Sequence, residues 1–192
     1  KLKMAAEDLH VPPDMCFKSA EEMLSREKLA DVLIVATQDQ QHIGQALAGL
    51  ERGYDLILEK PIATTPEDCI AIRDAARRLN RKVAVCYVLR YTTFYRTIKH
   101  IIQSGKIGDV VNIDAVENVG YWHQAHSFVR GNWSNCERSS PMILQKTFPD
   151  LIILNYLIGS PCDSISSFGS LSYFNAAHKP EGAADYCLDC PY

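Results

Sequence analysis

Between residues 31 and 89, short continuous apolar runs alternate with longer segments of helical periodicity. The runs at 31–36, 54–58 and 82–89 are typical of strands that are buried on both faces of a sheet. Between the first two runs, apolar residues recur at i, i+3, i+4 and i+7, which predicts an amphipathic helix. These residues are Ile43, Ala46, Leu47 and Leu50, and Gly53 is the natural terminator.

A second helix is predicted after the run at 54–58. Thr65 is a suitable N-cap, Pro66 suits the first helical position, and Asp68 stands where a capping box carries an acid. The stripe predicted to be buried is Cys69, Ile72, Ala76 and Leu79. Strand–helix–strand–helix–strand with short connections predicts a parallel sheet with right-handed crossovers. Residues 1–9 are predicted to end another helix.

The pattern changes near residue 90. Helices are predicted over 91–104 and 142–158, a strand over 110–117, and a strand-like, Ser-rich stretch over 164–174. The residues between 119 and 140 are irregular and rich in aromatic side chains. The second half therefore reads as an α+β domain.

Composition narrows the choice of partners. Apolar residues make up 47% of the 192 residues, enough for a sizeable core, and the net charge of −3 argues against nucleic acid. No apolar run approaches the ~20 residues that span a bilayer, so no membrane association is predicted. The seven cysteines, an odd number, indicate a reducing compartment, and we expect a cytoplasmic protein.

The two ends of the chain lead to two expectations. The chain begins without Met inside an amphipathic segment and closes on "CLDCPY", so we expect a fragment with sequence missing at both ends. Cys187 and Cys190 have metal-like spacing, with His178 nearby, but tetrahedral zinc needs four ligands. No metal site is predicted, although a metal-stapled interaction module built on these cysteines is one hypothesis.

Ligands of open parallel α/β sheets bind beyond the carboxyl ends of the strands. Here those ends lead into residues 37–42, 59–61 and 90–91, which are polar or ionisable. All three are predicted to emerge on one edge, as a binding site or as a solvated rim.

Lys60 is the sharpest candidate for chemistry. Because it precedes Pro61, its backbone is pushed into an extended conformation, which fixes the direction of its side chain. A lysine near another positive charge can serve as a general base or acid. The alternative is an ordinary surface lysine beside an exposed Glu59.

The stretch "DVLIVATQDQQHIGQALAGLERGYDLILEKPIA" resembles the first domain of the glucose–fructose oxidoreductase / inositol dehydrogenase (Gfo/Idh/MocA) family. The family pattern is a strand, T-x-x-x-x-H, a helix, a strand and E-K-P, matched here by Thr37, His42 and Glu59-Lys60-Pro61. The second half resembles one branch of the family in "VLRYTTFYRTIKHIIQSGKIGDVVNI", "ENVGYWHQAHSFVRGNW" and "SSPMILQKTFPDL".

The resemblance implies NAD(P)-dependent oxidoreductases of sugars, polyols or related alcohols. The implied fold class is α/β: a truncated Rossmann-like parallel sheet in residues 1–89, followed by a partial α+β domain with a mostly antiparallel open sheet in residues 90–192. The first part would bind NAD or NADP and the second a sugar- or polyol-like substrate. Family members commonly pair through the sheet face, so a homo-oligomer is expected for the complete protein.

The resemblance also assigns roles to residues. Lys60 would move the alcohol proton while hydride leaves the adjacent carbon for the nicotinamide. The implied cofactor-binding residues are Thr37, Gln38, His42, Glu59, Lys60 and Arg90, and the implied substrate-binding residues are His123, His126, Arg130, Lys146 and Asp150. His126 is also a candidate catalytic residue, with an exposed loop histidine as the alternative.

Two departures from the family pattern qualify these roles. No G-x-G-x-x-G spacing is present, so we expect this chain to bind dinucleotide poorly and to be inactive alone. Pro149 stands where the family has a catalytic histidine, and Gln145 stands at the usual aspartate position. Since proline cannot carry a proton, a second hypothesis is a degenerate member that binds a sugar-like ligand or partner without turnover.

Overall fold

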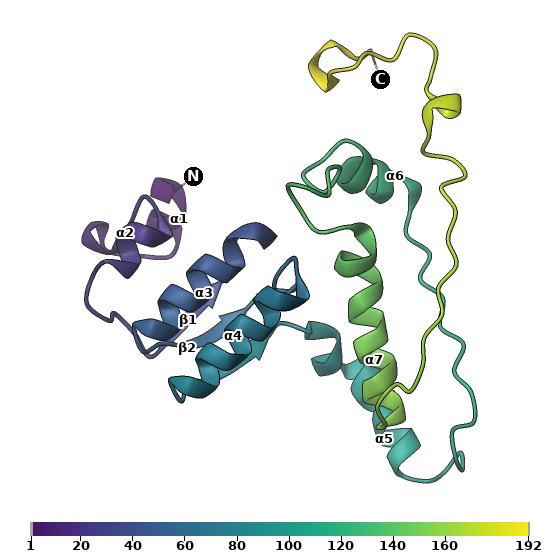
Figure 1. Ribbon diagram of the computed structural model, residues 1–192, viewed down its shortest axis with the longest axis horizontal. Helices are drawn as coiled ribbons and strands as arrows, with labels where there is room; N and C mark the ends of the chain where they lie inside the picture. The colour runs from purple at the N-terminus through teal and green to yellow at the C-terminus, as the bar shows by residue number, and fades with distance from the viewer. Residues whose placement is uncertain (1, 192) are drawn as a thin grey trace. The chain divides into compact units, whose positions relative to one another are not determined.

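The computed structural model describes residues 2–191, apart from the side chain of Cys187. The chain forms two compact units, Lys1–Cys86 and Tyr87–Tyr192, whereas the sequence predicts a boundary after residue 89. The two units are drawn together in Figure 1, and each is described by itself below.

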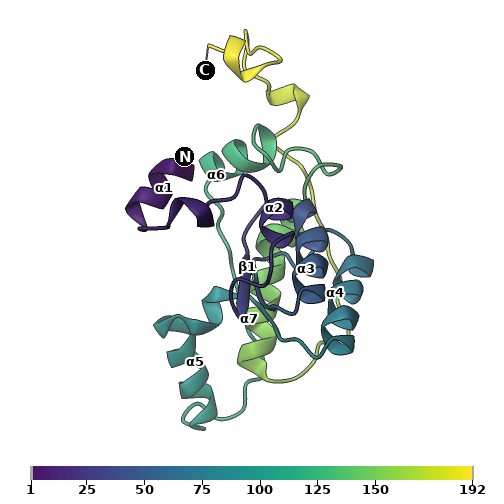
Figure 2. The same ribbon diagram turned by 90° about the vertical axis from the view of Figure 1, so that its left-hand side faces the viewer.

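A three-stranded parallel sheet forms the centre of the first unit. Strands β1 (Val32–Val35), β2 (Asp55–Leu58) and β3 (Val83–Val85) lie in the order β1-β2-β3. Helices α3 (His42–Glu51) and α4 (Pro66–Arg78) connect them and lie side by side (Figures 1 and 2). The predicted alternation of strands and helices is confirmed, although β3 is shorter than the run at 82–89.

Short helices complete the unit and precede or follow the first strand. They are α1 (Leu2–Asp8), η1 (Pro13–Met15), α2 (Ala20–Leu24) and η2 (Asp39–Gln41).

Local signals in the sequence set the helix ends. The Thr65 hydroxyl accepts a hydrogen bond from the Asp68 N–H at 3.2 Å, and Pro66 occupies the first turn of α4, as predicted. Gly53 has φ +84°, a left-handed conformation that turns the chain from α3 into β2 with little strain.

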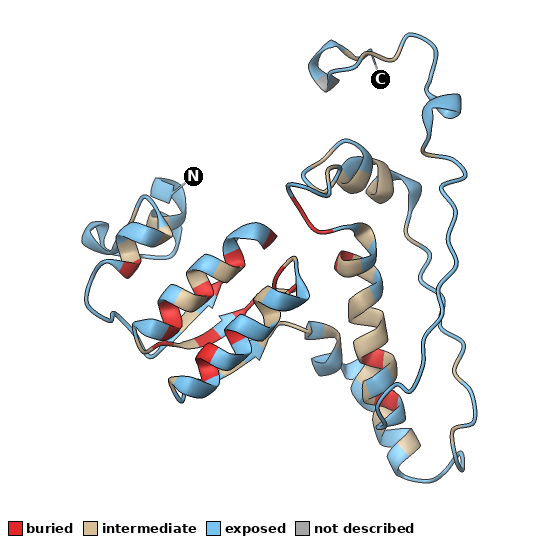
Figure 3. Ribbon diagram, in the orientation of Figure 1, coloured by how far each residue is buried: buried red, intermediate tan, exposed pale blue. Residues whose placement is uncertain are grey.

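The core lies between the helices and one face of the sheet (Figure 3). Leu50, Leu56 and Leu58 are fully buried there. On the other face Ile34 is 65% exposed and Ile57 is 37% exposed, so the prediction of strands buried on both faces is wrong in this structure. Since both crossovers advance across the sheet in one direction and are right-handed, they place both helices on the same face.

The second unit is built from helices. Its elements are η3 (Val88–Tyr91), α5 (Thr93–Gln103), α6 (Tyr121–Gln124), η4 (Ala125–Val129), η5 (Ile143–Thr147), α7 (Phe148–Ile158), η6 (Ala176–His178) and η7 (Cys187–Asp189). Helix α5 packs against α7, and the Lys99 ammonium donates a hydrogen bond to the Leu157 carbonyl at 3.0 Å. Within residues 2–191 no helix is long and apolar enough to cross a membrane.

The strand predicted over 110–117 does not form, and neither does the strand-like stretch over 164–174. The described residues of this unit contain no strand, so the expected antiparallel sheet is absent from them. A strand needs neighbours for its backbone hydrogen bonds, and Phe168 is 97% exposed.

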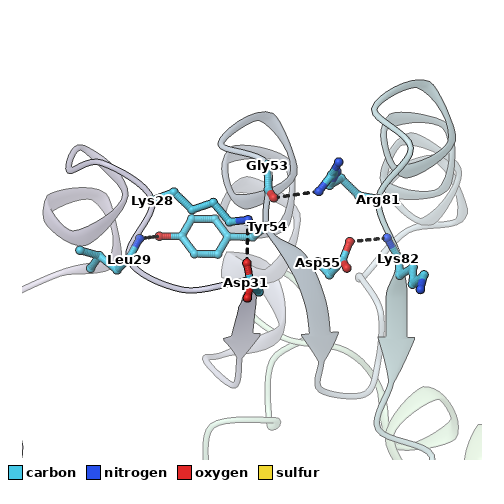
Figure 4. Close-up of polar contacts among 8 residues, drawn as sticks. All are labelled: Lys28, Leu29, Asp31, Gly53, Tyr54, Asp55, Arg81 and Lys82. Atoms are coloured by element: carbon cyan, nitrogen blue, oxygen red, sulfur yellow. Dashed lines mark hydrogen bonds and ion pairs between the residues drawn. The ribbon is translucent and has the colours of Figure 1, made fainter.

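The amino ends of the strands are tied together by polar contacts (Figure 4). The buried Tyr54 hydroxyl accepts a hydrogen bond from the Leu29 N–H at 2.9 Å, and the Lys28 ammonium lies 5.9 Å from the centre of the Tyr54 ring. The Arg81 guanidinium donates to the Gly53 carbonyl at 3.2 Å. These contacts link the residues that precede the three strands, at the edge of the sheet opposite the candidate site.

Replacing Tyr54 by Phe should lower the free energy of unfolding of the first unit by about 1 kcal/mol, because the Leu29 N–H loses its acceptor while the ring remains. Urea unfolding followed by circular dichroism measures this change. Tyr91→Phe is the control, since that side chain is 75% exposed, and an equal effect of the two variants would contradict the role of the Tyr54 hydroxyl.

Candidate functional site

The carboxyl ends of the three strands are level. Val35 is in register with Leu58, and Leu58 with Val85. The ladder continues one step further, because the Glu59 N–H donates to the Val35 carbonyl and the Cys86 N–H to the Leu58 carbonyl, each at 2.9 Å. The loop after β1, the segment after β2 and Cys86 therefore lie along one edge.

Glu59 folds back onto this edge. Its carboxylate accepts a hydrogen bond from the Lys60 N–H at 3.1 Å. It also interacts with the Cys86 thiol, whose pKa is raised by burial and then by the negative charge and hydrogen bond of Glu59. Glu59 thus contacts both its own loop and the residue that follows β3.

The backbone on either side of Lys60 is held in place. Pro61 is fully buried and Ala63 is buried, while Lys60 itself is half-buried. The ladder bond of Glu59 on one side and the packing of Pro61 on the other therefore fix where the Lys60 side chain leaves the edge.

His42 lies between the loops that follow β1 and β2. Its ring is 1% exposed, with Nδ1 2.8 Å from the Pro61 carbonyl oxygen and Nε2 3.2 Å from the Thr37 carbonyl oxygen. The Thr37 hydroxyl in turn lies 2.8 Å from Gln45 Oε1, and Gln38 is exposed. The sequence indicated His42 as a residue of this edge, but not that both ring nitrogens face backbone carbonyls.

Arg90 belongs to the second unit. Its guanidinium lies over the Tyr156 ring of α7, 4.8 Å from the ring centre, and the Lys99 ammonium lies 5.4 Å from the same centre. Its assignment to cofactor binding stays a prediction.

The histidine candidates sit on consecutive helical turns. His123, in α6, stacks on Trp122 with ring centres 5.4 Å apart. His126 lies exposed in η4, a π-helical turn, and Arg130 caps that turn. π-Helical turns are often found at functional sites, but they also occur without a function.

Lys146 and Asp150 form a second group, one helical turn apart. The pKa of Asp150 is raised, mainly by burial and then by the negative charge of Glu117. The positive charge of Lys146 opposes this rise. Asp150 also lines a mainly apolar cavity of about 670 Å³ between α5, α7 and residues 110–117. In the part of the chain that is described, no hydrogen bond or ion pair joins this group to His123 or His126.

Pro149 serves as a helix start. It stands in the first turn of α7, directly after the π-helical turn η5, in which the Phe148 N–H bonds to the Ile143 carbonyl. Gln145 is buried, and its Nε2 donates to the Ser140 hydroxyl at 2.7 Å. The positions at which the family pattern has histidine and aspartate are thus a helix start and a buried amide.

Metal ligands do not gather in the structure as described. No three His, Cys, Asp or Glu side chains among the described residues are placed to hold a metal ion. The side chain of Cys187 lies outside the described residues, and Cys190 is half-buried.

The parallel sheet of the first unit agrees with a sequence comparison. The profile of the Gfo/Idh/MocA family, described as an oxidoreductase family with an NAD-binding Rossmann fold, matches residues 1–87. Residues 1–87 thus match the family that the sequence motifs indicated. The α/β class and the Rossmann-like sheet predicted for the first unit are thereby confirmed.

Sequence similarity to one curated relative extends beyond residues 1–87. The Bacillus subtilis protein YteT, assigned by name to the oxidoreductases, is 30% identical over 185 residues, which are 94% of this chain and 42% of YteT. Inositol 2-dehydrogenase 2 of Saccharopolyspora erythraea is 36% identical over 93 residues, 47% of this chain and 27% of the relative. The chain therefore spans less than half the length of either relative.

A solved structure shares the fold of part of the chain. It is an inositol dehydrogenase homologue from Azotobacter vinelandii, complexed with NADH and myo-inositol. The sequences are 25% identical, the TM-score is 0.51, and the match covers 56% of this chain and 30% of the other.

Replacing Glu59 by Gln should speed alkylation of Cys86 severalfold at about pH 8. Removal of the negative charge lowers the raised thiol pKa toward its ordinary value, so more thiolate is present at that pH, while the effect of burial remains. Mass spectrometry of the Cys86 peptide measures the rate, with exposed Cys136 as the reference in the same sample. Glu27→Gln is the control, and an unchanged Cys86 rate in Glu59→Gln would contradict the contact.

Proposed function

We propose that the protein carrying these residues is an NAD- or NADP-dependent oxidoreductase that transfers a hydride between the nicotinamide and a sugar- or polyol-like alcohol. The observation that carries the proposal is the position of Lys60, half-buried at the carboxyl edge of a parallel sheet in an NAD-binding family. The names of the inositol dehydrogenases among the relatives support the choice of a polyol.

The carboxyl edge suits the nicotinamide end of a dinucleotide. Thr37, Gln38 and Glu59 border an edge on which Lys60 can lie next to the reacting carbon. The 192 residues contain no G-x-G-x-x-G, so they do not themselves supply such a loop for the pyrophosphate. The bound cofactor supplies the hydride acceptor or donor.

Lys60 would hold the substrate hydroxyl and exchange its proton as hydride transfer proceeds. General acid–base catalysis requires a group within hydrogen-bonding distance of that hydroxyl, and the fixed backbone at Pro61 would limit where the amine can go. His123, His126, Arg130, Lys146 and Asp150 are proposed to contact the substrate, with His126 the candidate for a second proton-transfer group.

A second candidate function is binding of a polyol-like ligand without turnover. Pro149 favours it, because the residue at this position has no side-chain proton to exchange and begins a helix. The two functions differ in whether Lys60 changes a rate or only an affinity.

The test measures NAD and NADP reduction by absorbance with a panel of polyols, for the protein that carries residues 1–192. Lys60→Ala should lower kcat by at least about 100-fold, because proton transfer is lost, with a smaller change in cofactor affinity. Lys60→Arg should fail similarly, since guanidinium does not release a proton at neutral pH.

Lys82→Ala is the matched control, an exposed lysine next to the opposite edge of the sheet, and it should leave kcat unchanged. Polyol binding by saturation-transfer NMR without reduction of either cofactor would favour the second function. Full activity of Lys60→Ala would overturn the assigned role of Lys60.

A further inference from the structure

We propose that His42 is a positioning residue that fixes Lys60 by tying the backbone of Pro61 to the loop after β1. The inference deepens the proposed function, because it rests on Lys60 as the proton-transfer group. It differs from the sequence-based expectation that His42 contacts the cofactor directly.

Pro61 offers a single backbone polar group to His42. Its backbone has no N–H, so the carbonyl is the only backbone polar group this residue can pair. His42 Nδ1 lies 2.8 Å from that oxygen in a buried setting. Because Pro61 is bonded directly to Lys60, a shift of this residue moves the point from which the Lys60 side chain starts.

The imidazole extends from a helix that is held in the core. His42 is the first residue of α3, whose Ala46 and Leu50 are fully buried in the core. Gln45, in the first turn of the same helix, meets the Thr37 hydroxyl at 2.8 Å. The first turn of α3 therefore contacts the loop after β1 through Gln45 and the imidazole of His42. The same imidazole contacts the segment after β2.

The position of the ring proton decides whether His42 can donate a hydrogen bond to Pro61. A neutral imidazole carries one N–H, and the proposal requires that proton on Nδ1, the nitrogen with the shorter contact, so that the ring donates to Pro61. The ring is 1% exposed and both nitrogens face carbonyl oxygens. A ring in this position acts on Lys60 through the backbone rather than by touching a ligand.

Two amide variants distinguish the contact made at Nδ1 from the contact made at Nε2. Asn at residue 42 can place its side-chain N–H₂ near the position of Nδ1, whereas the longer Gln reaches toward that of Nε2. Hydrogen–deuterium exchange of residues 59–63 should stay within about twofold of the parent chain in His42→Asn. It should rise about tenfold in His42→Gln and His42→Ala, which lose the bond to Pro61.

The ring itself gives an independent readout in the unmodified chain. ¹⁵N NMR of His42 should show a proton on Nδ1, alone or together with Nε2. A ring protonated only on Nε2 would overturn the proposal even if the variants fail to fold, since such a ring cannot donate to Pro61.

Leu50→Ala is the control, because it loosens the same helix without touching the imidazole. Equal rises in exchange at 59–63 in Leu50→Ala and His42→Gln would mean general loosening and would overturn the proposal. Equal effects of Asn and Gln at residue 42 would do the same. Neither exchange nor tautomer depends on cofactor or turnover, so failure of Lys60 as a catalytic residue would leave these results standing, and their failure would not touch the polyol assay.

Discussion

The level carboxyl ends of three parallel strands are the constraint on which the rest of the candidate site depends. Register pairs Val35 with Leu58 and Leu58 with Val85, and one further ladder bond on each side carries the alignment to Glu59 and Cys86. Parallel strands end at the same edge, so residues from separate parts of the chain meet there without any special contact. The position of Lys60 follows from this register.

Helix α3 links the core to that edge. Gly49 allows the close approach, because a Cβ there would lie 2.6 Å from a methyl carbon of Leu33. The helix buries Ala46 and Leu50 against the sheet and presents His42 at its first turn. The packing that stabilises the first unit is therefore also the packing that brings an imidazole between two loops.

The second unit follows a different logic. Its helices α5 and α7 pack against each other, and the Tyr156 ring of α7 is contacted by the cations of Arg90 and Lys99. Pro149 lies in the first turn of α7 after a π-helical turn, and Gln145 donates a hydrogen bond to the Ser140 hydroxyl. The residues that depart from the family pattern thus have structural partners or roles of their own, which is why turnover and binding alone are both worth testing.

The sequence by itself determined the strand–helix alternation of residues 31–85, the Thr65 cap, the Gly53 turn and the edge at which Lys60 emerges. Each of these depends on local periodicity, on backbone preferences of single residues or on a general rule for parallel sheets. Only the tertiary structure decided the contacts of His42 with Pro61, which are 19 residues apart, and of Glu59 with Cys86. It also decided that 110–117 is no strand and that one sheet face stays exposed. Pairing and burial need partners from elsewhere in the chain, and no local pattern specifies which partner arrives.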